Sequence, residues 1–246
     1  MTQFFDDRLL AAFMGNFYGY GNYQGPYWFI GMEEGGGDSF AEVSKRLAIW
    51  DQRGRGELED VVDYHLALGI DYPFVDHPKL QPTWAKLIRV LLSMEGQPPT
   101  KDEVRRFQQS SWARSSGNVC LMELLPLPSP STSHWLYGQH SKLPALADRA
   151  SYREHWSPLR VQALRQRIAA YKPRVVVFYG FSYSEYWRAI AGGELQPALA
   201  GDLLVRRDAE QLYGVMKHPA ATGVTSEYFH EAGLFLRRAL KGEIVV

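Results

Sequence analysis

The segment YWFIGMEEGGG, residues 27–37, carries the pattern from which the fold can be predicted. Its first four residues are large and apolar, which indicates a strand buried on both faces. Two glutamates and three glycines follow, and then Asp38 and Ser39 offer N-caps for a helix over residues 40–50. A strand, a tight acidic loop and a helix N-terminus form the usual ligand-binding arrangement of an open parallel sheet.

Three further apolar segments read as buried strands: residues 118–125, 174–180 and 212–217. Helical patterns alternate with them, which predicts an α/β fold, a single-domain doubly wound sandwich with a central four-stranded, mostly parallel sheet. We expect one domain over residues 1–246, with an N-terminal helix and aromatic loop (residues 1–24) packing on it, and an edge strand at 203–207. The other predicted helices cover residues 4–14, 58–68, 83–94, 101–109, 152–170 (interrupted near Pro158), 182–190 and 226–240.

The amino-acid composition of the chain limits which classes of function it can have. The formal net charge is zero, so a nucleic-acid surface would have to be a local patch and not a global basic field. The single cysteine, Cys120, excludes internal disulfides and thiolate-ligated clusters and suits a reducing compartment. The first residues lack the long apolar run of a signal peptide or membrane span, so we expect a cytoplasmic protein without a membrane partner.

Polar residues stand at the carboxyl end of each predicted strand. They are Glu33, Glu123, the pair Tyr179-Gly180, and His218. The carboxyl ends of parallel strands share one rim of the sheet, so these residues should converge there. The sequence therefore predicts an active site at this rim.

Taken in order, the strand ends resemble the uracil-DNA glycosylase superfamily over about residues 25–240. The segment Gly31-Met32-Glu33-Glu34-Gly35 is similar to the Gly-Met-Asn-Pro-Gly motif of the single-strand-selective branch, and His218-Pro219-Ala220 to the His-Pro-Ser motif. Residues 73–75 resemble the Pro-Phe-Val-Gly stretch whose phenylalanine stacks on the target base, and residues 174–180 the Arg-Val-Ile-Val-x-x-Gly strand. Residues 118–125 with the proline-rich loop after them resemble the strand that supplies the base-reading amide.

The resemblance implies a monofunctional DNA glycosylase, which flips a base out of the stack and hydrolyses its N-glycosidic bond. Glu33 would position water and offset the sugar's positive charge, and His218 would stabilise the departing base anion. It also implies a monomer that binds DNA and needs no cofactor and no metal. The remaining site residues would be Gly31, Met32, Gly35, Phe74 and Glu123 around the base, and Gly36, Ser129, Ser131 and Thr222 at DNA phosphates.

Departures from the family pattern bear on the substrate. Glu34 replaces the motif proline, so either glutamate could face the sugar, and Glu33 is favoured by motif position. Ala220 replaces the motif serine, and no bulky wedge residue follows it. Where some branches have a tyrosine that blocks the C5 side of a pyrimidine, Gly35 leaves that side open.

Glu123 replaces the uracil-reading asparagine. A carboxylate only accepts hydrogen bonds, which suits the exocyclic amine of cytosine, and a protonated carboxyl could also donate to N3. Together with Gly35, this favours a C5-modified cytosine over plain uracil. Such bases occur in some phage genomes, and antiphage glycosylases resembling this superfamily exist, so we expect a role in antiviral defence.

Simpler interpretations stay open for each residue. Glu33 could be a helix-capping acid, Glu123 a surface ion-pair partner, His218 a loop residue bonded to backbone, and Phe74 a core residue. The chain could also be a non-catalytic nucleic-acid-binding member of the superfamily. A third possibility is a metal-dependent nucleotide hydrolase that holds Mg²⁺ with Glu33, Glu34 and Asp38.

Overall fold

The computed structural model describes residues 3–246. The α-helices are α1 (Asp7–Asn16), α2 (Phe40–Gln52), α3 (Val61–Ala67), α4 (Pro82–Glu95), α5 (Lys101–Ser110), α6 (Tyr137–His140), α7 (Arg149–Tyr171), α8 (Ser184–Ala191) and α9 (Ser226–Leu240). The strands are β1 (Gly19–Gly21), β2 (Tyr27–Glu33), β3 (Leu58–Glu59), β4 (Val119–Leu125), β5 (Val175–Tyr179), β6 (Gln196–Ala198), β7 (Leu203–Arg207) and β8 (Leu212–Met216). Three short 3₁₀ helices are η1 (Pro144–Leu146), η2 (Phe181–Tyr183) and η3 (Leu199–Gly201).

The strands form one mixed sheet, which confirms the α/β class. The four strands predicted from the apolar segments lie side by side as β4-β2-β5-β8, and each neighbouring pair is parallel. The sheet is nevertheless larger than the predicted four strands, because its full order is β3-β1-β4-β2-β5-β8-β7-β6. The outer strands β1, β7 and β6 run antiparallel to their inner neighbours, and β3 pairs parallel with β1.

Strand β1 lies in the glycine-rich segment that the sequence pattern assigned to a loop. Gly19 and Gly21 have φ angles of +141° and +103°, which L side chains rarely adopt. A Cβ at either position would also collide with a backbone carbonyl of β4. The two glycines are therefore what allows β1 to pair with β4.

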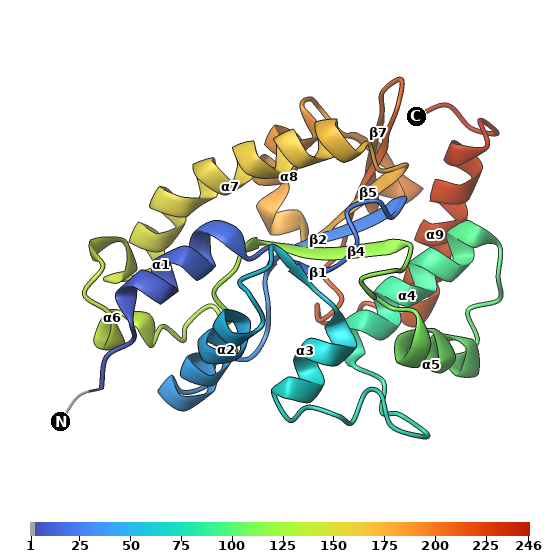
Figure 1. Ribbon diagram of the computed structural model, residues 1–246. Helices are drawn as coiled ribbons and strands as arrows, with labels where there is room; N and C mark the ends of the chain where they lie inside the picture. The colour runs from blue at the N-terminus through green and yellow to red at the C-terminus, as the bar shows by residue number, and fades with distance from the viewer. Residues whose placement is uncertain (1–2) are drawn as a thin grey trace.

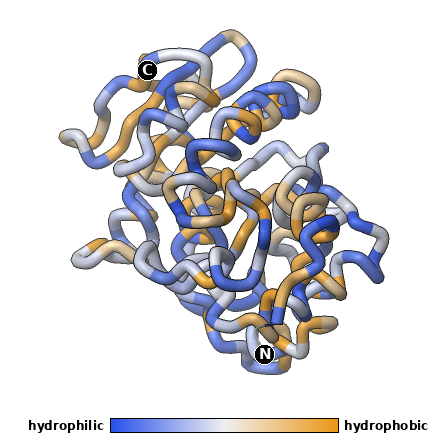
Figure 2. Tube along the Cα trace, turned by 90° about the vertical axis from the view of Figure 1, so that its left-hand side faces the viewer, coloured by the Kyte–Doolittle hydropathy of each residue, from blue (hydrophilic) through white to orange (hydrophobic). Residues whose placement is uncertain are grey.

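Helices cover both faces of the sheet (Figure 1). Helices α7 and α8 lie on one face, and α3, α4 and α5 lie on the other, with α9 packed against α4. Helix α1 packs on α2 through Phe13 and Trp50, whose ring centroids are 5.1 Å apart. Hydrophobic and hydrophilic residues alternate along the peripheral helices, as expected for helices that bury one side (Figure 2).

Two predicted helices differ in extent. Residues 58–59 form β3, and α3 begins only after Asp60, whose carboxylate caps it by accepting from the backbone N–H groups of Val62 and Asp63. Helix α7 begins at Arg149 and continues through Pro158 without interruption. Across residues 3–246, no helix combines the length and the apolar character needed to cross a bilayer.

Candidate active site

A cavity of about 810 Å³ opens at the carboxyl ends of the four parallel strands. Glu33, Glu123, Tyr179 and His218 all line it, one from each strand end. The predicted convergence of the strand ends is therefore observed. Side chains from β1, α3 and α4, which the sequence pattern did not assign to the site, complete the walls.

Glu123, Gly31 and Tyr179 form a row across β4, β2 and β5. Gly31 is the register partner of Glu123. A Cβ at residue 31 would collide with Oε2 of Glu123 and the hydroxyl of Tyr179, so glycine is needed for their close approach. The Tyr179 hydroxyl donates to Oε1 of Glu123 at 2.7 Å. Gly31 therefore does not line the cavity, and its role is to make room for the residues that do.

The carboxyl group of Glu123 is buried and carries a shifted pKa. Burial raises the pKa to about 8, Tyr179 opposes the shift by its hydrogen bond, and the carboxylates of Glu34 and Glu33 add to it. Within the described chain, Oε2 has no hydrogen-bond partner. The raised pKa favours the protonated form of Glu123, Oε2 has free hydrogen-bonding capacity, and the interpretation of Glu123 as a surface ion-pair partner is wrong.

His218 presents one ring nitrogen to the backbone. The N–H of Ala220 donates to Nδ1 at 3.1 Å, so the proton of the neutral ring resides on Nε2. Burial, reinforced by the charge of Lys86, lowers the pKa of His218 below its ordinary value. At neutral pH the imidazole is uncharged and keeps Nε2–H available as a donor.

Glu33 is held by two arginines from α7. Nη1 of Arg149 donates to its Oε2, and Nη2 of Arg153 lies 3.5 Å from its Oε1. Arg149 also donates to Oγ of Ser129 at 2.6 Å and thereby ties the loop after β4 to Glu33. The helix-capping interpretation of Glu33 is wrong, because Ser39 caps α2.

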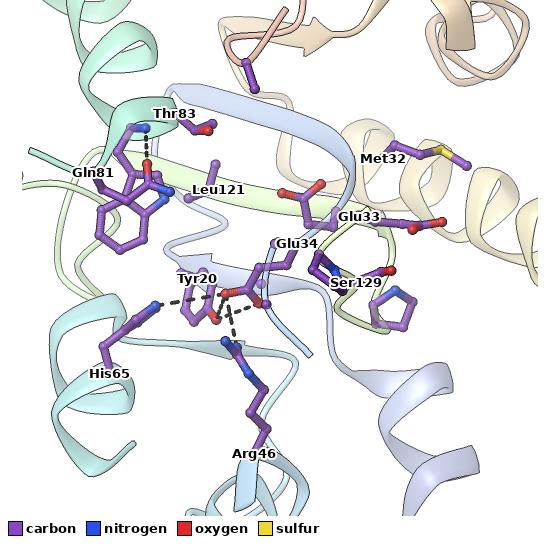
Figure 3. A pocket seen from close by; sticks show the side chains of 18 of the residues that line it. Tyr20, Met32, Glu33, Glu34, Arg46, His65, Gln81, Thr83, Leu121 and Ser129 are labelled. Carbon is purple, nitrogen blue, oxygen red and sulfur yellow. Dashed lines mark hydrogen bonds and ion pairs between the residues drawn. The ribbon is translucent and has the colours of Figure 1, made fainter. Parts of the chain in front are cut away.

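Glu34 points in another direction (Figure 3). It accepts from the Tyr20 hydroxyl at 3.0 Å and from Nη1 of Arg46 at 3.2 Å. Nε2 of His65 lies 4.0 Å from the same carboxylate, while Nδ1 of His65 is 2.7 Å from the Val61 carbonyl oxygen. Glu34 thus belongs to a network that joins β1, α2 and α3 along one wall of the cavity.

Most of the other predicted site residues line the cavity. They are Met32, Gly35, Gly36, Ser129 and Ser131. Gly35 faces open space, since a Cβ built there would meet no atom within 4 Å. The exposed residue Thr222 does not line the cavity, so its predicted phosphate contact lies apart from this site.

Phe74 also lies outside the cavity lining. Its half-buried ring packs against His65 and Trp84, with centroid separations of 6.1 Å to each. His65 and Trp84 are the aromatic residues of this wall that reach the cavity. Phe74 therefore packs behind two aromatic residues that line the cavity and does not itself offer a surface to it.

Several site residues were missed by sequence reasoning: Tyr20, Arg46, His65, Trp84, Arg149 and Arg153. One of them, Arg46, carried a signal. Arg46 lies on the apolar face of α2 between Val43 and Leu47, where a charged residue is unusual. Arg149 and Arg153 stand at helical i,i+4 spacing, but nothing in the sequence connects them to Glu33.

The carboxylates do not form a metal site. Among residues 3–246, no group of three His, Cys, Asp or Glu side chains is arranged to hold a metal ion. Glu33 and Glu34 are turned toward different arginines, and Asp38 is exposed. The donor set required by the nucleotide-hydrolase alternative is thus not assembled.

Comparison with known proteins adds no assignment: no protein-family model matches the chain, and no curated protein is significantly similar to it.

Proposed function

We propose that the chain is a monofunctional DNA glycosylase of the uracil-DNA glycosylase type, which excises a C5-modified cytosine and serves in defence against phage. The observation that carries the proposal is the convergence of Glu33, Glu123 and a neutral His218 on one cavity at the carboxyl ends of four parallel strands. The four motif-bearing strands are direct neighbours in the sheet, which supports the proposal.

His218 suits the role of stabilising a departing base. Negative charge grows on a base oxygen as the glycosidic bond breaks, and a fixed N–H donor in a water-poor site stabilises such charge strongly. Ala220 fixes the tautomer that keeps Nε2–H free. A neutral imidazole donates this hydrogen bond without transferring a full proton first.

Glu33 suits the role of the acid beside the sugar. Glu33 and Glu34 both line the cavity and both are bound by arginines, so Glu33 is chosen as the group beside the sugar for its motif position. Glu33 can orient water and offset the positive charge of an oxocarbenium-like sugar. No metal ion or cofactor takes part in this scheme.

Glu123 and Gly35 support a modified cytosine. In its acid form, Glu123 accepts through Oε1 and donates through Oε2, which matches the amine and N3 of cytosine. A protonated Glu123 whose donor and acceptor oxygens are exchanged would match uracil. The hydrogen bonds of Glu123 alone therefore do not select a C5-modified base, and that preference depends on the open space at Gly35. Uracil therefore belongs in the test.

The test is base release measured by mass spectrometry in EDTA. The substrates are DNAs that carry uracil, 5-hydroxymethyluracil, 5-hydroxymethylcytosine or glucosylated 5-hydroxymethylcytosine. We expect release of a modified cytosine, reduced on the order of 10²- to 10⁴-fold in Glu33→Gln and His218→Ala. Gly35→Tyr should abolish release of C5-substituted bases specifically.

Other outcomes would redirect the assignment. Release of uracil alone would remove the modified-cytosine preference and leave the glycosylase. DNA binding without release of any base would point to the non-catalytic member. Activity on nucleotides that EDTA abolishes would favour the metal-dependent hydrolase.

A further inference from the structure

Two arginines at the start of α7, Arg149 and Arg153, have no role in the scheme above beyond holding Glu33. Their i,i+4 spacing places both guanidinium groups on one side of the helix. Positive charge near a helix N-terminus opposes the helix dipole. Helix stability therefore does not explain this arginine pair.

The arginine pair has hydrogen-bonding capacity that the protein does not use. Nε of Arg149 and Nε of Arg153 are buried without a hydrogen-bond partner in the described part of the chain. Nη2 of Arg153 and Oε1 of Glu33 lie 3.5 Å apart and have only this long ion pair with each other. Buried unsatisfied donors are costly and uncommon, and two cationic ones beside a long ion pair indicate that a further anionic group completes the site.

The arginine pair borders the mouth of the cavity. Arg149 donates to Oγ of Ser129 and to the carbonyl oxygen of Ser131, both of which line the cavity. Arg153 lies over the ring of Tyr183, another lining residue, at 5.6 Å from the centroid. The Arg153 side chain is also the more accessible of the two, at 28% against 12% exposed.

We infer that the arginine pair binds a phosphate of the nucleic-acid backbone, and that this phosphate exchanges with Glu33 for the two guanidinium groups. Without nucleic acid, the arginines neutralise Glu33. A bound phosphate draws them away and leaves the carboxylate free beside the sugar. Guanidinium groups suit this exchange, because carboxylate and phosphate offer the same bidentate geometry.

The inference deepens the proposed function and rests on it for the identity of the anion. Its first test is binding of a fluorescent oligothymidylate, which contains no cytosine, measured by anisotropy over a range of salt concentrations. Arg153→Ala should lower affinity roughly tenfold, as expected for one lost charge-assisted hydrogen bond. The slope of log affinity against log salt should fall by about 0.7, the value for one single-strand phosphate contact.

The matched control is Arg165→Ala, which removes an exposed arginine from the same helix and should leave affinity and slope unchanged. Arg153 is the variant of choice, because Arg149 also holds the loop after β4. Circular dichroism would verify that each variant is folded. Unchanged binding in folded Arg153→Ala would overturn the phosphate site.

Competition between Glu33 and phosphate for the arginine pair predicts a substitution that raises the affinity for the oligonucleotide, in contrast to Arg153→Ala. Glu33→Gln should bind the oligonucleotide more tightly than the wild type, because it no longer competes for the arginines. Glu34→Gln removes the same charge one residue away, but its partner is Arg46, so it should change affinity less. Equal effects of the two substitutions would show that Glu33 does not compete for the arginine pair.

A second ligand separates failure of this inference from failure of the proposed function. Inorganic phosphate should raise the melting temperature of the wild type and have a smaller effect on Arg153→Ala. Stabilisation by phosphate without oligonucleotide binding would keep the anion site and refute the nucleic-acid function. Absence of both responses would refute both.

Discussion

At residue 31, the lack of a side chain allows Glu123 and Tyr179 to approach each other closely. Gly31 has no positive φ, so alanine there meets only a steric obstacle: Oε2 of Glu123 and the hydroxyl of Tyr179. Gly31→Ala must push both groups aside, and overpacking of this kind costs about 1–3 kcal/mol of unfolding free energy. Urea denaturation measures the loss.

Gly35→Ala is the control for that substitution. The added methyl group meets nothing within 4 Å and the backbone is not strained, so the free energy of unfolding should change by less than about 0.5 kcal/mol. Similar losses in both variants would mean that the close approach at Gly31 does not matter to the fold.

These residues also show how far sequence reasoning reaches. Glu33, Glu123 and His218 were placed at the site because each ends an apolar strand, and parallel strand ends meet. The function of Gly31 was not predictable, since it depends on the register of β2 against β4 and on a tyrosine from β5. Arg149 was missed because its partner Glu33 lies 116 residues away in the chain.

Among the elements, α7 is attached to the sheet by one buried arginine. Nε of Arg160 donates to the Leu124 carbonyl at 2.8 Å, and Nη2 donates to the Glu123 carbonyl at 3.1 Å. The guanidinium group also lies 3.5 Å from the centroid of the Tyr18 ring. Arg160 therefore joins α7 to β4 next to the residue proposed to read the base, and adds a contact to the segment before β1.

Replacing Arg160 should damage this junction. Arg160→Leu leaves the two strand-end carbonyls without these donors, and we expect a loss of about 3 kcal/mol in the free energy of unfolding. Denaturant unfolding tests it, with the exposed Arg165→Leu on the same helix as the control, for which little change is expected. Equal stability of the two variants would contradict a structural role for Arg160.

The elements differ in how well their own sequence specifies them. Strands β2, β4, β5 and β8 are mostly apolar runs. Strands buried on both faces have such runs, so they can be recognised from the sequence. The short strands β1, β3 and β6 exist only through pairing with their neighbours, so no local pattern marks them. Pro158 suggested a break in α7, but tertiary packing holds the helix continuous.

For the whole molecule, the net charge of zero does not show that acidic side chains gather at the cavity. The chain has 27 basic and 27 acidic residues, yet three glutamates converge on one cavity. Two of them are neutralised by arginines, Glu34 by Arg46 and Glu33 by the arginine pair. The third, Glu123, has no ion-pair partner among the described residues, and burial raises its pKa to about 8.

The protonation of Glu123 should make the stability of the molecule depend on pH. Its pKa is about 8 in the folded protein and 4.5 as its ordinary value, so between these pH values the folded state holds a proton that the unfolded state has lost. The free energy of unfolding should therefore fall as pH rises through this range, by up to roughly 1.4 kcal/mol per pH unit.

Glu123→Gln keeps an acceptor for Tyr179 and cannot ionise, so it should remove this dependence and be more stable than the wild type at pH 8. Urea unfolding from pH 5 to about pH 8 measures both, with Glu231→Gln on the exposed side of α9 as a control that should retain the wild-type dependence. Parallel curves for wild type and Glu123→Gln would mean that Glu123 is ionised in the folded protein, and the acid form that reads the base would have to be abandoned.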